Sequence, residues 1–228
     1  MSFYYEQRRL GNDRVALEPF DPSLHTAKFV EEKRAQPEIL TYLSFPAGET
    51  EEEFKDFYEK YINSPPSDCL YAIIDKANPE KDFNANYAGA IALATTNREN
   101  ASTEIGIIVF PAFQRSHVSS NAIGLLLQYT LDPPSAGGLG LRRVEWKCHA
   151  GNESSRRAAL RMGFELEGIL RWERAFPGGA VGLSVDALEK RNGTSGEAPG
   201  RHTAIFSIVW DEWDEKRAKV VGIMERKS

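Results

Sequence analysis

The stretch that decides the fold is residues 107–120, IIVFPAFQRSHVSS, in which a strand pattern passes through a short loop into a helix pattern. Its apolar β-branched residues predict a strand, and Ser119–Leu131 has the periodicity of an amphipathic helix. The free N–H groups and the dipole at the start of such a helix attract anions. Arg115 adds a positive charge to the loop, and three serines add hydroxyl donors, namely Ser116, Ser119 and Ser120. We therefore expect this junction to bind phosphate.

A second unit of the same kind follows about thirty residues later. The expected strand Arg143–His149 leads into an expected helix Asn152–Met162, which Gly163 terminates. Asn152 and Ser155 lie at the opening of this helix, where Asn152 is also a good N-cap and needs no ligand to explain it. Two successive units that each open with polar donors favour a shared ligand site, although simple capping remains an alternative.

The rest of the chain alternates between helix and strand patterns, and Thr50 with Glu53 forms a capping-box pattern. Further helices are expected at Ser23–Ala35 and Thr50–Ile62, and strands at Leu70–Asp75, Tyr87–Thr96, Thr103–Phe110, Phe164–Ala175 and Ala204–Trp210. The segment Pro177–His202 is rich in Gly, Ala and Ser, so we expect a surface insertion or hairpin loop. This order predicts one domain over residues 1–228 with an α+β fold, in which a mixed, mostly antiparallel central sheet is flanked by helices on both faces.

Composition argues against several classes of protein. The 228 residues carry 28 Lys plus Arg and 33 Asp plus Glu, a net charge of −5, so a nucleic-acid partner is not expected. Cys69 and Cys148 are too few for a disulfide framework, and four scattered histidines suggest no metal site. With no apolar run of about 18 residues and no signal-peptide pattern, we expect a cytoplasmic protein without a membrane partner.

Taken in order, these motifs resemble the GNAT superfamily of acyl-CoA-dependent N-acetyltransferases, in particular its RimJ/RimL-like branch. The resemblance spans residues 17–213 and implies the acyl-CoA N-acyltransferase fold. The matching pieces are Glu104-Ile105-Gly106, the loop Gln114–Ser119, Asn152 with Ser155 and Arg157, Gly163-Phe164, Glu167-Gly168-Ile169-Leu170-Arg171, and the closing strand with Asp211-Glu212-Trp213.

One departure concerns the loop, where the family pattern has Gly and then Gly or Ala. This chain has His117 and Ser119 at those two positions. Glycine there lets the backbone approach a pyrophosphate closely. The His117 side chain must therefore either point away from the ligand or contact the phosphates itself.

The resemblance implies acetyl-CoA as cosubstrate, lying between the strands Thr103–Phe110 and Arg143–His149, and no metal. Its pyrophosphate would lie on the N–H groups of residues 115–120. The cofactor-binding residues expected on this basis are Val109, Gln114, Arg115, Ser116, His117, Val118, Ser119, Ser120, Asn152 and Arg157.

The implied chemistry is direct attack of a primary amine on the thioester. Glu104 is the expected base, acting through a water; the alternatives are that it merely pairs with a neighbouring Lys or Arg, or that His149 is the base. A backbone N–H around Val109 or Phe110 would polarise the thioester carbonyl. Ser155 would supply a proton or hydrogen bond to the departing thiolate.

Other candidates have less specific signals. Cys148 offers a two-step route through an acyl-enzyme, although nothing in the sequence lowers its pKa. Trp146 is expected in the core or the pocket wall. Tyr42 and Phe45 fall where the resemblance places the cover of the acceptor site, with core packing as the alternative.

The function expected from the resemblance is transfer of an acetyl group to a protein N-terminus or a small amine, by a monomer or a homodimer. The alternative is a catalytically inactive CoA-binding or regulatory module with the same fold. His117 and Ser119 favour the module, whereas Glu104, Asn152 and Ser155 favour the enzyme.

Overall fold

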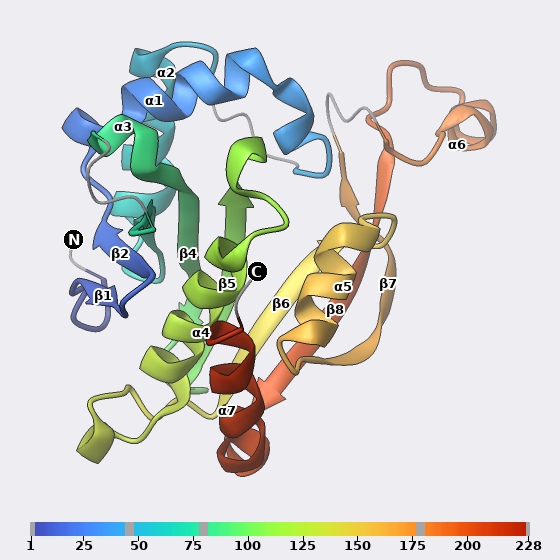
Figure 1. The fold of residues 1–228 in the computed structure, drawn as a ribbon. Helices are drawn as coiled ribbons and strands as arrows, with labels where there is room; N and C mark the ends of the chain where they lie inside the picture. The colour runs from blue at the N-terminus through green and yellow to red at the C-terminus, as the bar shows by residue number, and fades with distance from the viewer. Residues whose placement is uncertain (1–2, 44–47, 78–81, 177–180, 227–228) are drawn as a thin grey trace.

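The computed structural model describes residues 3–43, 48–77, 82–176 and 181–226, and its centre is a strongly twisted sheet (Figure 1). Eight strands of the described chain lie in the order β1-β2-β3-β4-β5-β6-β8-β7. Their bounds are β1 Leu10–Gly11, β2 Val15–Pro19, β3 Cys69–Asp75, β4 Tyr87–Asn97, β5 Ser102–Val109, β6 Arg143–His149, β7 Glu165–Ala175 and β8 Gly200–Val209. Every pairing is antiparallel except that of β5 with β6, so the sheet is mixed and mostly antiparallel, as expected.

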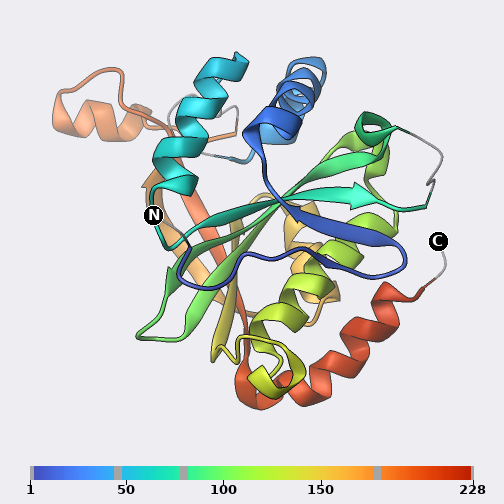
Figure 2. The same ribbon diagram turned by 90° about the vertical axis from the view of Figure 1, so that its left-hand side faces the viewer.

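Helices cover both faces of the sheet, which confirms the expected α+β architecture (Figure 2). The helices are α1 Pro22–Ala35, α2 Glu51–Tyr58, α3 Phe83–Asn86, α4 His117–Leu131, α5 Glu153–Arg161, α6 Asp186–Asn192 and α7 Trp210–Met224. Short 3-10 turns lie at Pro37–Leu40, Pro111–Phe113 and Pro134–Ala136, and a π turn at Glu59–Asn63 continues α2. The expected capping box is present, because Thr50 accepts from the Glu53 N–H and Glu53 accepts from the Thr50 N–H.

Two apolar cores hold these layers together. The larger core packs α4, α5 and α7 on one face of the sheet, with Leu126, Trp146 and Phe206 fully or almost fully buried. The smaller one packs α1 and α2 on the other face around Phe54 and Phe110. Burial of this apolar surface is the main term that stabilises the fold.

Helix α7, which follows the last strand β8, packs on α4, which follows β5. A Cβ at Gly124 would collide with the Met224 side chain, which would have to shift, so glycine favours this close approach of the two helices. At the end of α4 the buried Asp132 carboxylate accepts hydrogen bonds from Trp213 Nε1 at 2.7 Å and from Arg217 Nε at 2.8 Å. Through these contacts α7 links the strands that precede α4, β1 to β5, to those that follow it, β6 to β8.

Strands β5 and β6 pair over only three residue pairs, from Ser102↔Arg143 to Glu104↔Glu145. Beyond Glu104, β5 continues along β4 alone, and β6 continues along β8 alone. The two strands therefore diverge and leave a wedge in the middle of the sheet (Figure 1).

The structure differs from the expected elements at the end of the last strand and at the N-terminal strands. Trp210 does not end the last strand but begins α7, where Glu212 Oε1 accepts from the Val209 N–H at 3.0 Å and starts the helix. The short strands β1 and β2 have no counterpart in the sequence-based expectation. Within the expected insertion 177–202, residues 177–180 lie outside the described residues, and the remainder contains α6 and the start of β8.

Candidate active site

A cavity of about 1340 Å³ extends from the wedge to the face covered by α1 and α2. Eleven of the twelve residues expected at the site line it: Glu104, Val109, Gln114, Arg115, Ser116, His117, Ser119, Ser120, Asn152, Ser155 and Arg157. Val118 does not line it, because its side chain is buried in the larger core and its N–H donates to Ser116 Oγ. The structure thus brings together residues from both strand–loop–helix units.

The loop before α4 is held by its own side chains. Ser116 is the N-cap of α4, since its Oγ accepts from the Val118 N–H and donates to the Phe113 carbonyl at 2.6 Å. Arg115 has a φ of +59°, a left-handed conformation that is uncommon outside glycine. Its exposed side chain and the first N–H groups of α4 border the cavity, which is the arrangement an anion site needs.

The orientation of His117 answers the question that the loop raised. Its Nε2 lies 3.0 Å from Asp75 Oδ1 at the end of β3, and both side chains are about one-tenth exposed. Asp75 Oδ1 also accepts from the Ala77 N–H at 3.0 Å, which fixes the carboxylate. The imidazole is therefore anchored to a neighbouring strand, although the residue still borders the cavity at the first turn of α4.

The backbone at the end of β5 offers one donor to the wedge. The Phe110 N–H is already bonded to the Ala88 carbonyl of β4 at 2.9 Å, so Phe110 cannot polarise a thioester carbonyl. Because hydrogen-bonded and non-hydrogen-bonded pairs alternate in an antiparallel ladder, the Val109 N–H points the other way, into the wedge. Gln114 Nε2 donates to the Val109 carbonyl at 3.0 Å and ties the loop to this strand.

On the other side of the wedge, α5 presents Asn152 and Ser155. Asn152 Oδ1 accepts from the Ser155 N–H at 3.0 Å, so it is the N-cap of α5 and also positions Ser155. Trp146 Nε1 donates to Ser155 Oγ at 3.0 Å, and the Ser155 hydroxyl in turn lies within hydrogen-bonding reach of the Cys148 thiol. Trp146 is buried and also lines the cavity, so it is both core and pocket wall.

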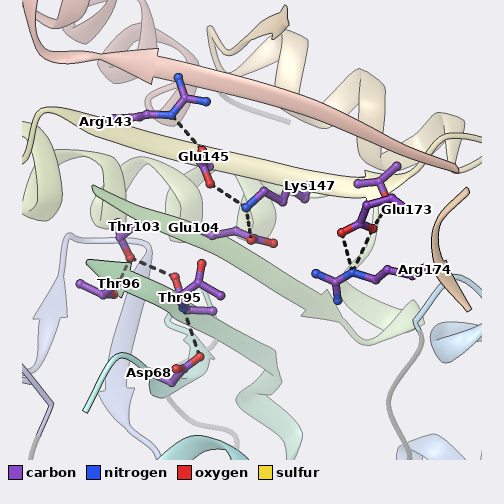
Figure 3. Close-up of polar contacts among 12 residues, drawn as sticks. Asp68, Thr95, Thr96, Thr103, Glu104, Arg143, Glu145, Lys147, Glu173 and Arg174 are labelled. Carbon is purple, nitrogen blue, oxygen red and sulfur yellow. Dashed lines mark hydrogen bonds and ion pairs between the residues drawn. The ribbon is translucent and has the colours of Figure 1, made fainter. Parts of the chain in front are cut away.

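Glu104 lies on β5 and lines the cavity, and its carboxylate faces Lys147 of β6 (Figure 3). Lys147 Nζ donates to Glu104 Oε2 at 3.2 Å and to Glu145 Oε2 at 2.7 Å, so both proposed features of Glu104, a cavity position and a lysine partner, are present. Burial raises the pKa of Glu104, and the neighbouring Lys147 only partly opposes this. A carboxylate in this setting is a stronger base than an exposed one.

The alternative base and nucleophile are placed less favourably. His149 Nδ1 accepts from the Gly151 N–H at 2.9 Å, which occupies the lone pair of the neutral ring. Burial and the Arg201 charge lower the pKa of His149. Burial raises the pKa of the Cys148 thiol, although Ser155 opposes this, and a thiol is a poor nucleophile in its protonated form.

The remaining candidate residues that the structure describes lie at the rim or in the wall of the cavity, and four further residues reach the site without having been expected there. Arg157 lies at the exposed rim, where it pairs with Glu153 at 2.9 Å. Tyr42 lines the cavity and its ring centroid lies 5.4 Å from that of His149, whereas Phe45 lies outside the described residues. The residues of the site that the sequence did not single out are Asp75, Lys147, Arg174 and Arg201. They lie outside the motifs, and the pairing of strands brings them to the site.

Comparison with known proteins identifies the family. The family model described as acetyltransferase (GNAT) domain matches residues 14–165, and the chain belongs to this family. The crystal structure of a GCN5-related N-acetyltransferase from Brucella melitensis has a TM-score of 0.75 at 28% identity, covering 96% of this chain and 86% of that one. Mycobacterium smegmatis RimJ, solved in complex with CoA-disulfide, shares the fold with a TM-score of 0.69 at 15% identity, covering 94% and 93%.

A curated relative is similar over a shorter stretch. The uncharacterized N-acetyltransferase YoaA of Bacillus subtilis (strain 168) is 31% identical over 83 residues, which is 36% of this chain. The match spans 44% of that relative's length.

Two further properties of the described residues concern metal ions and the membrane. In the ranges that the structure describes, no group of three or more His, Cys, Asp or Glu side chains is arranged to hold a metal ion. Among the described residues, none of the helices has the length and apolar character needed to cross a membrane.

Proposed function

We propose that this protein is an acetyl-CoA-dependent N-acetyltransferase that transfers the acetyl group directly to a primary amine. The observation that carries the proposal is the wedge between β5 and β6, which combines a partly buried carboxylate, the start of α4 and the start of α5 in one cavity. Family membership and the similarity to the GCN5-related N-acetyltransferase from Brucella melitensis support it. The CoA-disulfide named in the RimJ complex supports the choice of cosubstrate.

The residues of the wedge fit acetyl-CoA, whose thioester supplies the electrophilic carbonyl. The unpaired edges of β5 and β6 offer backbone groups to an extended pantetheine chain, as in strand addition. The first turn of α4 and Arg115 suit its pyrophosphate because both attract anions. His117 needs no contact with the phosphates, since Asp75 holds its ring.

Each catalytic role follows from a position already described. Glu104 removes a proton from the acceptor ammonium through a water, because an amine attacks only when it is neutral. The Val109 N–H stabilises the negative charge that develops on the carbonyl oxygen. Ser155 stabilises the departing thiolate by a hydrogen bond from its hydroxyl, while Trp146 holds the hydroxyl oxygen in place.

The inactive-module alternative loses its main support. It depended on His117 and Ser119 closing the phosphate loop, but the His117 ring is directed to Asp75 and both residues border an open cavity. The presence of Glu104, Asn152 and Ser155 in the same cavity favours an enzyme.

Calorimetric titration with acetyl-CoA, followed by a thiol-release assay on a panel of amines, tests this proposal. We expect micromolar binding of acetyl-CoA and amine-dependent release of CoA. Absence of binding up to about 1 mM, equivalent to about −4 kcal/mol, would contradict cosubstrate use. Tight binding without turnover of any amine would support the inactive module instead.

The phosphate loop gives a sharper prediction about affinity. We expect Arg115→Ala to weaken acetyl-CoA binding about 10-fold, because it removes a charge-assisted contact, and His117→Ala to change the affinity by less than about 2-fold. His117→Ala should instead lower the melting temperature, because Asp75 loses a buried partner. Calorimetry and thermal unfolding measure the two effects; a 10-fold loss of affinity in His117→Ala would show that the ring contacts the phosphates.

A further inference from the structure

The cavity contains a buried arginine that none of the roles above explains. Arg201 lies on β8, is 7% exposed and lines the cavity. Its Nε has no hydrogen-bond partner among the described residues, and its guanidinium takes part in none of the ion pairs found there. A buried charge without a partner is costly, so this position is built for an anionic group that is supplied from outside the chain.

The cations around Arg201 are already paired, which distinguishes it from them. Lys147 is held between Glu104 and Glu145, and the Arg174 Nε lies 3.0 Å from Glu173 Oε2 (Figure 3). Thr203 Oγ1 donates to the same Glu173 at 2.9 Å, which further satisfies that carboxylate. Arg201 is therefore the member of this cluster left to bind a ligand.

The position of Arg201 points to the acceptor. Residues alternate between the faces of a strand, and β6 and β8 pair with Lys147↔Ile205 and His149↔Thr203 in register. Arg201, two residues before Thr203, therefore faces the same side of the sheet as Lys147, which contacts Glu104. The proposed base and the unpaired guanidinium thus lie on one face of the sheet and border one cavity.

We propose that Arg201 binds a carboxylate of the acceptor, so that the preferred substrates are small amino carboxylates in which an amine and a carboxylate are carried by one molecule. This inference rests on the proposed acetyltransferase function and specifies its acceptor. The guanidinium anchors the carboxylate through charge-assisted hydrogen bonds, while the amine reaches Glu104. Burial and the nearby Arg174 charge lower the pKa of Arg201 more than the Glu173 and Glu104 charges raise it, and an incoming carboxylate would stabilise the charged guanidinium against both effects.

The direct test compares matched acceptors in the thiol-release assay with acetyl-CoA. The series runs from glycine to 6-aminohexanoate, each against its own carboxamide, because the chain length selects the span between the two sites. For the best length we expect the carboxylate to exceed the carboxamide about 10- to 100-fold in kcat/KM. In Arg201→Gln this ratio should fall to about one, while Arg201→Lys keeps part of it. Equal use of carboxylates and carboxamides by the wild type would overturn the proposal.

A matched control uses Arg171, which is exposed on β7 and does not line the cavity. Arg171→Gln should retain the wild-type ratio. The melting temperature gives a second readout, because removing an unpaired buried charge should leave the ligand-free Arg201→Gln protein at least as stable as the wild type. A lower melting temperature with an unchanged acceptor ratio would assign Arg201 a structural role and overturn the proposal.

Two further arms separate this inference from the proposed function. If the wild type acetylates other amines of the panel but no member of the series, this inference fails and the proposed function stands. If the wild type binds acetyl-CoA but acetylates no amine at all, the proposed function fails, and titration of 4-aminobutanoate into the CoA-loaded protein tests Arg201 alone. Binding that Arg201→Gln abolishes would retain the carboxylate site, and no binding would remove it. An Arg201 effect on succinyl-CoA rather than on the acceptor would place the carboxylate in the acyl group and overturn the assignment to the acceptor.

Discussion

In Glu104→Gln we expect kcat to fall about 10²- to 10⁴-fold, while the affinity for acetyl-CoA stays within about 2-fold of the wild type. The amide has nearly the same size as the carboxylate and can still contact Lys147, so the cavity keeps its shape. It cannot accept a proton, so the acceptor amine stays protonated. Steady-state kinetics and calorimetry on the same preparation separate the two effects.

Glu145→Gln is the matched control for this variant. Glu145 shares Lys147 with Glu104 but does not line the cavity, so we expect its substitution to change kcat by less than about 3-fold. If both variants lost activity equally, the placement of Lys147 would explain the loss and Glu104 would not be the base.

The pH profile gives an independent signature of the same group. Burial raises the pKa of Glu104 above its ordinary value of 4.5, and a base acts only when deprotonated. The kcat/KM of the wild type should therefore fall as the pH is lowered through this raised pKa, with the acid limb above pH 4.5. In Glu104→Gln that limb should disappear and leave only the titration of the amine itself.

The second large effect concerns stability. In Asp132→Ala we expect the free energy of unfolding to fall by about 3 kcal/mol, because Trp213 Nε1 loses its partner and Arg217 loses its carboxylate. For a domain of this size the melting temperature should drop by about 6–12 °C. Urea unfolding followed by tryptophan fluorescence and circular dichroism measures the change.

Glu215→Ala provides the comparison, since Glu215 is exposed on α7, the helix that carries Trp213 and Arg217. It should change the free energy of unfolding by less than about 0.5 kcal/mol. Arg217→Ala should have an intermediate effect, because the Arg217 side chain is 44% exposed and Asp132 keeps its bond to Trp213. Equal stability of Asp132→Ala and Glu215→Ala would refute the role of Asp132 in joining α7 to α4.

Much of the fold can be predicted from the sequence, because the patterns that indicate its strands and helices are local. The strand pattern before Pro111 and the helix pattern from Ser119 lie in one stretch, and the structure places β5 and α4 there. The assignment of Trp210 to a strand was wrong because tryptophan favours strands, whereas Glu212 determines the helix start through a contact with the backbone. Strands β1 and β2, with two and five residues, are too short for a periodic signal.

The candidate site can be predicted only in part, because some of its contacts join residues that are far apart in the sequence. Helix openings such as Asn152 and Ser155 carry their signal in the next few residues. The anchoring of His117 by Asp75, 42 residues earlier, depends on the pairing of strands, and so does the placement of Arg201. Likewise, the choice of Val109 over Phe110 as a donor depends on the bond from the Phe110 N–H to β4.

The packing of α7, the last helix of the chain, on α4 has a consequence for synthesis on the ribosome. The chain emerges from its N-terminus, so β1 to β5 with α4 can assemble first, and β6 to β8 follow as a second group. These two groups are joined in the sheet by only three residue pairs between β5 and β6, and α7 joins them only after both have been translated. Nascent chains stalled before residue 210 should therefore contain two folded halves at a variable angle, and they should acquire the capacity to bind CoA only when residues 210–224 have left the exit tunnel.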